Sequence, residues 1–124
     1  MAWIIISLFG AVGTGLRYGL SLLGNSPDAN AIPWGTWLAN VIGSAALGVV
    51  FILGEGKSIA GVDARLVLGT GLLGGFTTYS AFNLESLRFL QAGAWSKFAL
   101  YVVGTVVVCL LSAFVGLRIA RGMR

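Results

Sequence analysis

The densest group of residues able to do chemistry is the stretch GTGLLGGFTTYSAF, residues 69 to 82. It contains a G-x-G-x-x-G pattern in Gly69, Gly71 and Gly74, which can mark a turn that binds the phosphates of a dinucleotide. That function also needs a strand before the glycines and an acidic residue about 20 positions further on. The same stretch carries hydroxyl groups and aromatic rings, whose O–H groups and electropositive ring edges can contact a small anion. The surrounding elements must decide between these two kinds of site.

Small and polar residues also recur at helical spacing through the apolar runs elsewhere in the chain. Each of three runs places them on one face of a helix: Ser7, Gly10, Thr14, Arg17 and Ser21; Thr36, Asn40 and Ser44; Tyr101, Thr105 and Ser112. An amide or a charge inside a membrane span is expensive and by default indicates a functional site. Asn40 is therefore a candidate site residue, whereas Arg17 has two open interpretations, a structural role at a helix end and an electrostatic one.

The composition identifies the elements that must position these residues. With 57% hydrophobic and only 10% charged residues, the chain falls outside the range of soluble proteins, which are about a quarter charged. A membrane span takes about 20 residues, and the turn-forming segments divide the chain into four spans near residues 2–23, 34–54, 65–90 and 96–118. The expected fold is thus all-α, a single transmembrane domain of four bundled helices over residues 1–124.

Several function classes are disfavoured by what the chain contains. Without histidine, neither a Ser-His-Asp triad nor a histidine metal site can be built, and no pair of residues resembles a catalytic acid and base, so we expect no enzyme. The single cysteine, Cys109, is interpreted as a small apolar filler. The basic residues are scattered or gathered in a tail, which fits a membrane-surface anchor better than a nucleic-acid site.

The opening stretch lies inside the third span, with no strand before it, which rules out the dinucleotide interpretation. Adjacent glycines weaken a helix, and the threonines after Gly74 and Gly75 can bond to the backbone groups that a break would free. We therefore predict a broken helix at GGFTT. The carbonyl groups that end its first half can bind a cation, and the amides that begin its second half can face an anion.

These motifs carry a resemblance to a known family. GLLGGFTTYSAF, together with PWGTWLANVIGS in the second span and GTGLRYGL in the first, resembles the Fluc (CrcB-type) fluoride channels. The resemblance implies a dual-topology antiparallel homodimer in the inner membrane of a prokaryotic cell. It further implies two fluoride pores and a structural Na⁺ ion at the centre of the dimer. Such a channel exports fluoride and lowers the fluoride concentration of the cytoplasm.

The resemblance also implies roles for individual positions. The carbonyl groups of Gly74 and Thr77 would hold the sodium ion, Asn40 would be the pore amide, and Tyr79 and Phe82 would present ring edges to fluoride. Further members of the pathway would be Thr36, Ser80, Glu85, Tyr101, Thr105 and Ser112. Two positions depart from the family pattern, which usually has Phe at Tyr79 and Thr at Ala81.

Two alternatives stay open at this point. A small proton-coupled multidrug-type exporter has a similar length, but it needs a carboxylate within the membrane, and Glu85 lies near a span end. An accessory subunit of a membrane complex would explain the small-residue packing faces. Small residues also let helices approach closely in any bundle, as Gly15 and Gly19 could in a G-x-x-x-G contact. The weak charge bias between the two ends of the bundle would allow insertion in both orientations.

Overall fold

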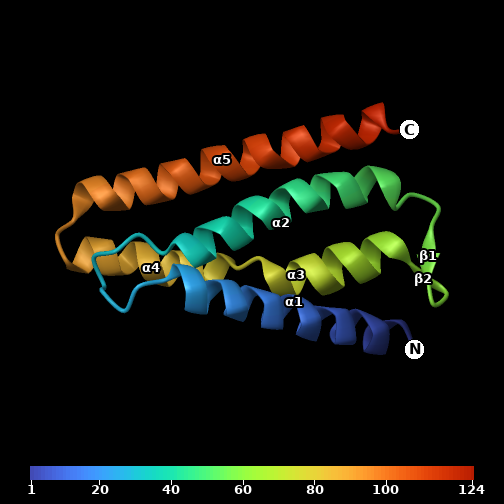
Figure 1. The fold of residues 1–124 in the computed structure, drawn as a ribbon, viewed down its shortest axis with the longest axis horizontal. Helices are drawn as coiled ribbons and strands as arrows, with labels where there is room; N and C mark the ends of the chain where they lie inside the picture. Colours follow the sequence, from blue (N-terminus) through green and yellow to red (C-terminus); the bar gives the residue numbers. More distant parts are fainter.

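The computed structural model describes all 124 residues, which form an elongated bundle of nearly parallel and antiparallel helices (Figure 1). Three helices are long and apolar enough to cross a membrane: α1 (Ala2–Gly24), α2 (Trp34–Leu53) and α5 (Trp95–Gly122). The third layer along the chain consists of three pieces in sequence, η1 (Arg65–Leu73), α3 (Gly74–Phe76) and α4 (Tyr79–Gln91). These bounds agree with the expected spans, apart from α5, which begins at Trp95 and continues to Gly122.

The third layer is interrupted where the sequence predicts it. Its first piece, η1, is a π-helix that contains Gly69 and Gly71, so the G-x-G-x-x-G pattern lies in helical backbone and not in a turn after a strand. The helix ends after Phe76 because Thr77 and Thr78 both adopt extended backbone, with ψ angles of 159° and 120°. A new helix, α4, then starts at Tyr79 with the Thr78 side chain as its N-cap, accepting a hydrogen bond from the Ala81 amide at 3.2 Å.

Close backbone contacts through glycine hold the layers together. A Cβ atom on Gly13 would lie 1.9 Å from the Leu72 carbonyl oxygen, and one on Gly116 would lie 2.0 Å from the Ala45 carbonyl oxygen. These two sites join α1 to η1 and α2 to α5, and any larger residue there would separate the helices. Gly15 and Gly19 make no such contact within the chain, since no atom of another helix lies within 4 Å of where their Cβ atoms would be.

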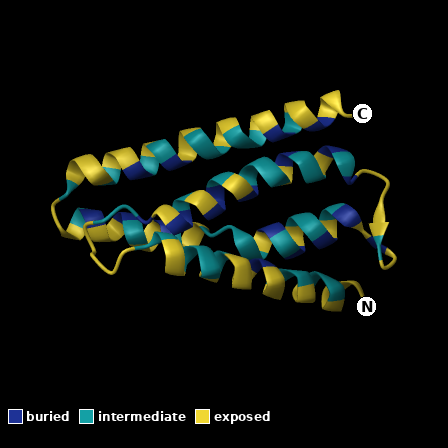
Figure 2. Cartoon of the chain, in the orientation of Figure 1, coloured by how far each residue is buried: buried dark blue, intermediate teal, exposed yellow.

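Exposed and half-buried residues make up most of the bundle (Figure 2), and many of the exposed ones are large and apolar. Only 22 of 124 residues are buried, and large side chains such as Leu23, Leu100 and Leu110 are mostly exposed. A water-soluble monomer rarely exposes apolar patches of this extent, whereas lipid solvates them. Long apolar helices with exposed apolar side chains agree with the prediction of a multi-pass membrane protein.

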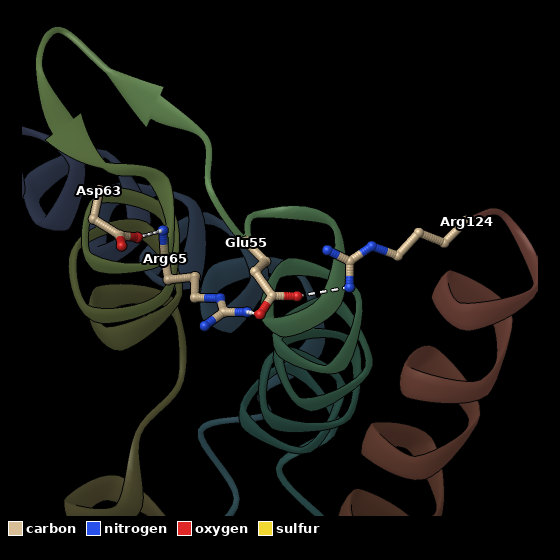
Figure 3. Close-up of polar contacts among 4 residues, drawn as sticks. All are labelled: Glu55, Asp63, Arg65 and Arg124. Atoms are coloured by element: carbon tan, nitrogen blue, oxygen red, sulfur yellow. Dashed lines mark hydrogen bonds and ion pairs between the residues drawn. The ribbon is translucent and has the colours of Figure 1, made fainter.

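The end of the bundle that carries both termini also holds a short hairpin and an ion-pair cluster (Figures 1 and 3). Strands β1 (Ser58–Ile59) and β2 (Val62–Asp63) pair antiparallel, around a turn in which Ala60 and Gly61 both have positive φ. Sequence reasoning missed this hairpin because such a turn usually contains Asn, Asp or Gly at its first position.

The ion-pair cluster is centred on Glu55 (Figure 3). Its carboxylate lies 2.6 Å from Nη1 of Arg124 and 3.5 Å from Nη2 of Arg65, and so joins the end of α2 to η1 and to the C-terminus. The hydrogen bond and the charge of Arg124, followed by the charge of Arg65, lower the pKa of the Glu55 carboxyl below its ordinary value. The Arg65 guanidinium also covers the Phe51 ring, 4.8 Å from its centroid.

Candidate functional site

The helix break is held by a side chain from the neighbouring helix. Asn40, buried on α2, accepts a hydrogen bond from the Thr78 amide at 2.7 Å and donates one from Nδ2 to the Thr78 carbonyl at 3.1 Å. The amide side chain thus pairs with both backbone groups of the extended residue, in place of the helical partners that the break removes. Because an amide nitrogen has two hydrogens, one N–H of Asn40 is left for another acceptor.

A second set of contacts satisfies the carbonyl end of the break from the opposite side. Arg17 on α1 donates from Nε to the Gly75 carbonyl at 3.2 Å, and the Thr14 hydroxyl approaches the same oxygen at 3.5 Å. A positive charge at the C-terminal end of a helical segment is favourable, since the carbonyl groups there carry partial negative charge. Of the two interpretations of Arg17, the structure supports a contact with helix-end carbonyl groups.

The break has two carbonyl groups that neither helical half satisfies, those of Gly74 and Thr77. The amide that would normally close onto Gly74 belongs to Thr78, which donates to Asn40 instead, and the Thr77 amide donates to Leu73 at 2.9 Å. Thr77 lies outside both α3 and α4, so its carbonyl begins no helical hydrogen-bond ladder. Gly74 is exposed on the bundle surface. These two oxygens are the positions at which the family resemblance implies a sodium ion.

A groove of about 350 Å³ runs beside the break, between α2, the start of α4 and α5. Its walls are mostly apolar, with polar groups at intervals. The lining residues are Asn40, Ser44, Thr78, Tyr79, Phe82, Thr105, Val106, Cys109, Leu110 and Ala113. Four of the predicted site residues, namely Asn40, Tyr79, Phe82 and Thr105, are therefore brought together in one groove, although they come from three separate helices.

One group in this groove lacks a partner. Thr105 is only 5% exposed, and its hydroxyl is buried without a hydrogen bond. A buried hydroxyl with no partner is costly in an apolar environment, so the Thr105 hydroxyl is free to donate to an additional acceptor. The neighbouring rings contribute edges and faces: Phe82 lies between Tyr79 and Tyr101, with ring centroids 5.7 Å and 5.3 Å away.

Next to the groove, where Tyr101 contacts Phe82, a chain of hydrogen bonds ends on the carboxylate of Glu85. This is the only carboxylate within the interior of the bundle. The Thr36 hydroxyl donates to Oε1 of Glu85 at 2.7 Å, and the Tyr101 hydroxyl donates to Oε2 at 2.6 Å. Asn25 extends the chain, since its Nδ2 donates to the Thr36 oxygen at 3.1 Å. Three predicted residues from three helices thus form one network around the Glu85 carboxylate.

Two predicted members of the pathway lie elsewhere. The Ser112 hydroxyl donates to the Val41 and Cys109 carbonyl groups at 3.1 Å and 2.9 Å, and Ser112 does not line the groove. Ser80 is exposed beside the groove, with its oxygen 3.3 Å from the Thr78 hydroxyl. The geometry thus gives Ser112 a helix-packing contact, while Ser80 lies near the pathway on the surface of the bundle.

The comparisons with known proteins agree with this arrangement. Residues 4–117 match the family described as CrcB-like protein, Camphor Resistance (CrcB). The chain is 40% identical over 119 residues to the fluoride-specific ion channel FluC of Sorangium cellulosum, covering 96% of this chain and 94% of that protein. It is 38% identical to the FluC proteins of Opitutus terrae and Thermus thermophilus, covering 98% and 94% of this chain and 93% of each relative.

The chain belongs to the CrcB/FluC family of fluoride-specific ion channels. Its relatives are bacterial multi-pass membrane proteins and ion channels, so the expectation that the chain is not an enzyme is confirmed. The exporter and accessory-subunit alternatives have no support from these matches. Membership of the CrcB/FluC family confirms the resemblance drawn from the span-two and span-three motifs.

Sequence reasoning did not identify every residue at the site. Asn25 accepts hydrogen bonds from the Gly35 and Thr36 amides at 2.8 Å and 3.3 Å and so caps α2 from ten residues away. No local spacing rule predicts such a contact. Cys109 was expected to be an apolar filler, but it lines the groove beside Ser44. Its position one helical turn after Thr105 could have suggested this, because residues four apart share a helix face.

Proposed function

We propose that this protein is a fluoride channel that lets fluoride leave the cytoplasm down its electrochemical gradient, and that the groove beside the break is part of the ion path. The observation that carries the proposal is the convergence of Asn40, Phe82 and the unpartnered Thr105 hydroxyl at one apolar groove of a FluC family member. Fluoride holds its hydration water tightly, so a selective path must replace that water with hydrogen-bond donors and exclude larger anions by its width.

The pathway donors proposed here are the free N–H of Asn40, the Thr105 hydroxyl and the edge of the Phe82 ring. None of them carries a full positive charge, which would retain the ion instead of passing it on. Tyr79 is 75% exposed on a single chain, so its ring edge would face the pathway only when another surface covers it. Tyr79 has a hydroxyl that the usual Phe lacks. This hydroxyl can then form a hydrogen bond with a group other than the ion, while the ring edge contacts fluoride.

The Glu85 network gives the path a specific entrance step. Thr36 and Tyr101 already donate their hydroxyl hydrogens to the two carboxylate oxygens of Glu85. In the resting arrangement these two donors are therefore occupied by the carboxylate. A fluoride ion can use them only by replacing the carboxylate as acceptor. We propose that Glu85 swings aside as fluoride arrives and returns when it leaves, which keeps the donors paired at all times.

We further propose that the working unit is an antiparallel homodimer. The break between α3 and α4 lies near the middle of the bundle's long axis (Figure 1), and Gly74, Tyr79 and Ser80 beside it are exposed. Backbone at that depth must not face lipid. A second copy in the opposite orientation would cover this face and meet the break of the first at mid-depth. The charge difference between the two ends is small enough for both insertions.

The dimer centre would hold a sodium ion between the two breaks. The donor set fits, because the Gly74 and Thr77 carbonyl groups have no helical partner and oxygen atoms suit a hard monovalent cation. When bound, the ion supplies positive potential near the groove without contacting fluoride. The residues of this chain do the positioning: Asn40 fixes Thr78, and Arg17 fixes Gly75, so that both free oxygens keep their place.

The test is ion efflux from liposomes that contain only this protein, followed with fluoride-selective and chloride-selective electrodes. Rapid fluoride loss without chloride loss is the expected result. Retention of fluoride by liposomes that contain folded protein and sodium would refute the channel. The dimer is tested separately, by labelling a cysteine placed at the C-terminus of a Cys109→Ala variant: labelling of every C-terminus from one side only would exclude opposed orientations.

A further inference from the structure

The groove contains a reactive group that the proposed path does not need. Cys109 lies in its wall on α5, one helical turn after Thr105, and the Ser44 hydroxyl of α2 lies next to its thiol. The thiol has no disulfide partner, since it is the only cysteine in the chain. A thiol becomes chemically important when small molecules or ions can reach it, and half-buried Cys109 opens onto the same space as the proposed pathway.

A second observation indicates that this part of the groove accommodates a ligand and is not merely a packing gap. The hydroxyl of Thr105 is buried and unpartnered, and its side chain lines the same groove. An acceptor that satisfies it must pass within one helical turn of Cys109, because residues 105 and 109 share a face of α5. Any group added to the Cys109 sulfur therefore enters the volume through which that acceptor moves.

We propose that Cys109 is a modification site inside the ion path, where a small thiol-reactive disulfide-forming compound closes the channel reversibly. The proposal rests on the proposed function, because closing has meaning only if fluoride passes through the groove. In the reaction with methyl methanethiosulfonate, the Cys109 sulfur attacks the divalent sulfur of the reagent, not the sulfonyl sulfur. A new S–S bond forms as the bond to the sulfonyl group breaks, methanesulfinate leaves, and the thiol proton passes to solvent.

Two changes would then block conduction. The methylthio group fills space between Cys109 and the facing Asn40 and Phe82 side of the groove, where fluoride has to travel. It also removes the S–H group, so the sulfur no longer offers even a weak hydrogen bond. Dithiothreitol reverses both changes by thiol–disulfide exchange, which regenerates the free thiol.

The experiment measures fluoride efflux from proteoliposomes before reagent, after methyl methanethiosulfonate and after dithiothreitol, with intact-protein mass spectrometry at each stage. The wild type should gain one methylthio group per chain, lose most of its fluoride efflux and regain it on reduction. The Cys109→Ala and Cys109→Ser variants, each compared with its own rate before reagent, should show no mass gain and no change of rate.

A position control uses Val107, which lies on α5, is exposed and does not line the groove. Val107→Cys in the Cys109→Ala background should gain the methylthio group without loss of efflux. Labelling of wild-type Cys109 with unchanged efflux overturns the proposal, as does failure of the thiol to react, or an equal block through Val107→Cys. Absence of efflux from the wild type before any reagent is a different result, since it refutes the pathway itself.

Discussion

The pairing of Asn40 with Thr78 leads to the most informative prediction. Replacing Asn40 by Leu keeps a side chain of similar size but removes both hydrogen bonds to the backbone of the break. Neither backbone group of Thr78 has another hydrogen-bond partner in the structure. Both its amide and its carbonyl are therefore left unsatisfied beside an apolar side chain.

The magnitude is set chiefly by the unsatisfied amide, because a buried N–H without a partner is tolerated less often than a buried carbonyl. An unsatisfied buried donor costs about 1–3 kcal/mol, so Asn40→Leu should lower the free energy of unfolding by roughly that amount, or by less if lipid or water reaches the amide. The matched control is Asn83→Leu, which makes the same chemical change at an exposed position of α4 without a hydrogen bond to lose. We expect the control to be neutral or slightly stabilising in a membrane environment.

Stability is measured by equilibrium unfolding in detergent micelles. The folded protein is then reconstituted into liposomes, and its fluoride efflux is measured. Asn40→Leu should be less stable than Asn83→Leu and should conduct poorly even when folded, since the path loses the free N–H. Asn40→Asp should conduct less still, because a carboxylate would face the Thr78 carbonyl and repel the anion. Equal stability of Asn40→Leu and Asn83→Leu would show that the break does not depend on this amide.

Three further predictions concern the rings, the helix contacts and the ion-pair cluster. Phe82→Ile should reduce fluoride efflux, whereas Phe89→Ile, which changes a buried ring outside the groove, should mainly reduce stability; equal efflux in both variants would exclude a role for the ring edge. Gly13→Ala should cost about 1–3 kcal/mol through overpacking, against no loss for Gly15→Ala in open space, and equal melting temperatures would contradict the α1–η1 contact. Because ion pairing lowers the Glu55 pKa from 4.5, its small stabilisation should be present above that pH and disappear as the pH falls through the lowered value; Glu55→Gln should lack this pH dependence in thermal unfolding scans.

Much of the architecture follows from the sequence because it depends on local physics. The apolar runs must be helices, since a bilayer leaves backbone polar groups no other partner, and the ends of α1 and α2 lie within a residue of the expected bounds. The break at Thr77 and Thr78 was predictable for the same reason, because Gly74 and Gly75 weaken the helix next to residues that can satisfy a freed backbone.

The tertiary structure alone decides which of the polar residues act together. Spacing placed Ser112 with Tyr101 and Thr105 on one side of a helix, yet the rotation of α5 against α2 directs its hydroxyl to the Val41 carbonyl. The same rotation places Cys109, which looked like a filler, in the wall of the groove. A helical pattern fixes the angle between residues on one helix but not the direction in which that helix faces its neighbours.

Asn40 illustrates the division most clearly. Its residue type and depth in an apolar span were enough to indicate a function, because a buried amide must have a partner. The identity of that partner, the backbone of Thr78, depends on how α2 packs against a break 38 residues later in the chain. The amino-acid sequence determined that polar groups would have to be satisfied inside the membrane, and only the packing of the helices decided which groups satisfy one another.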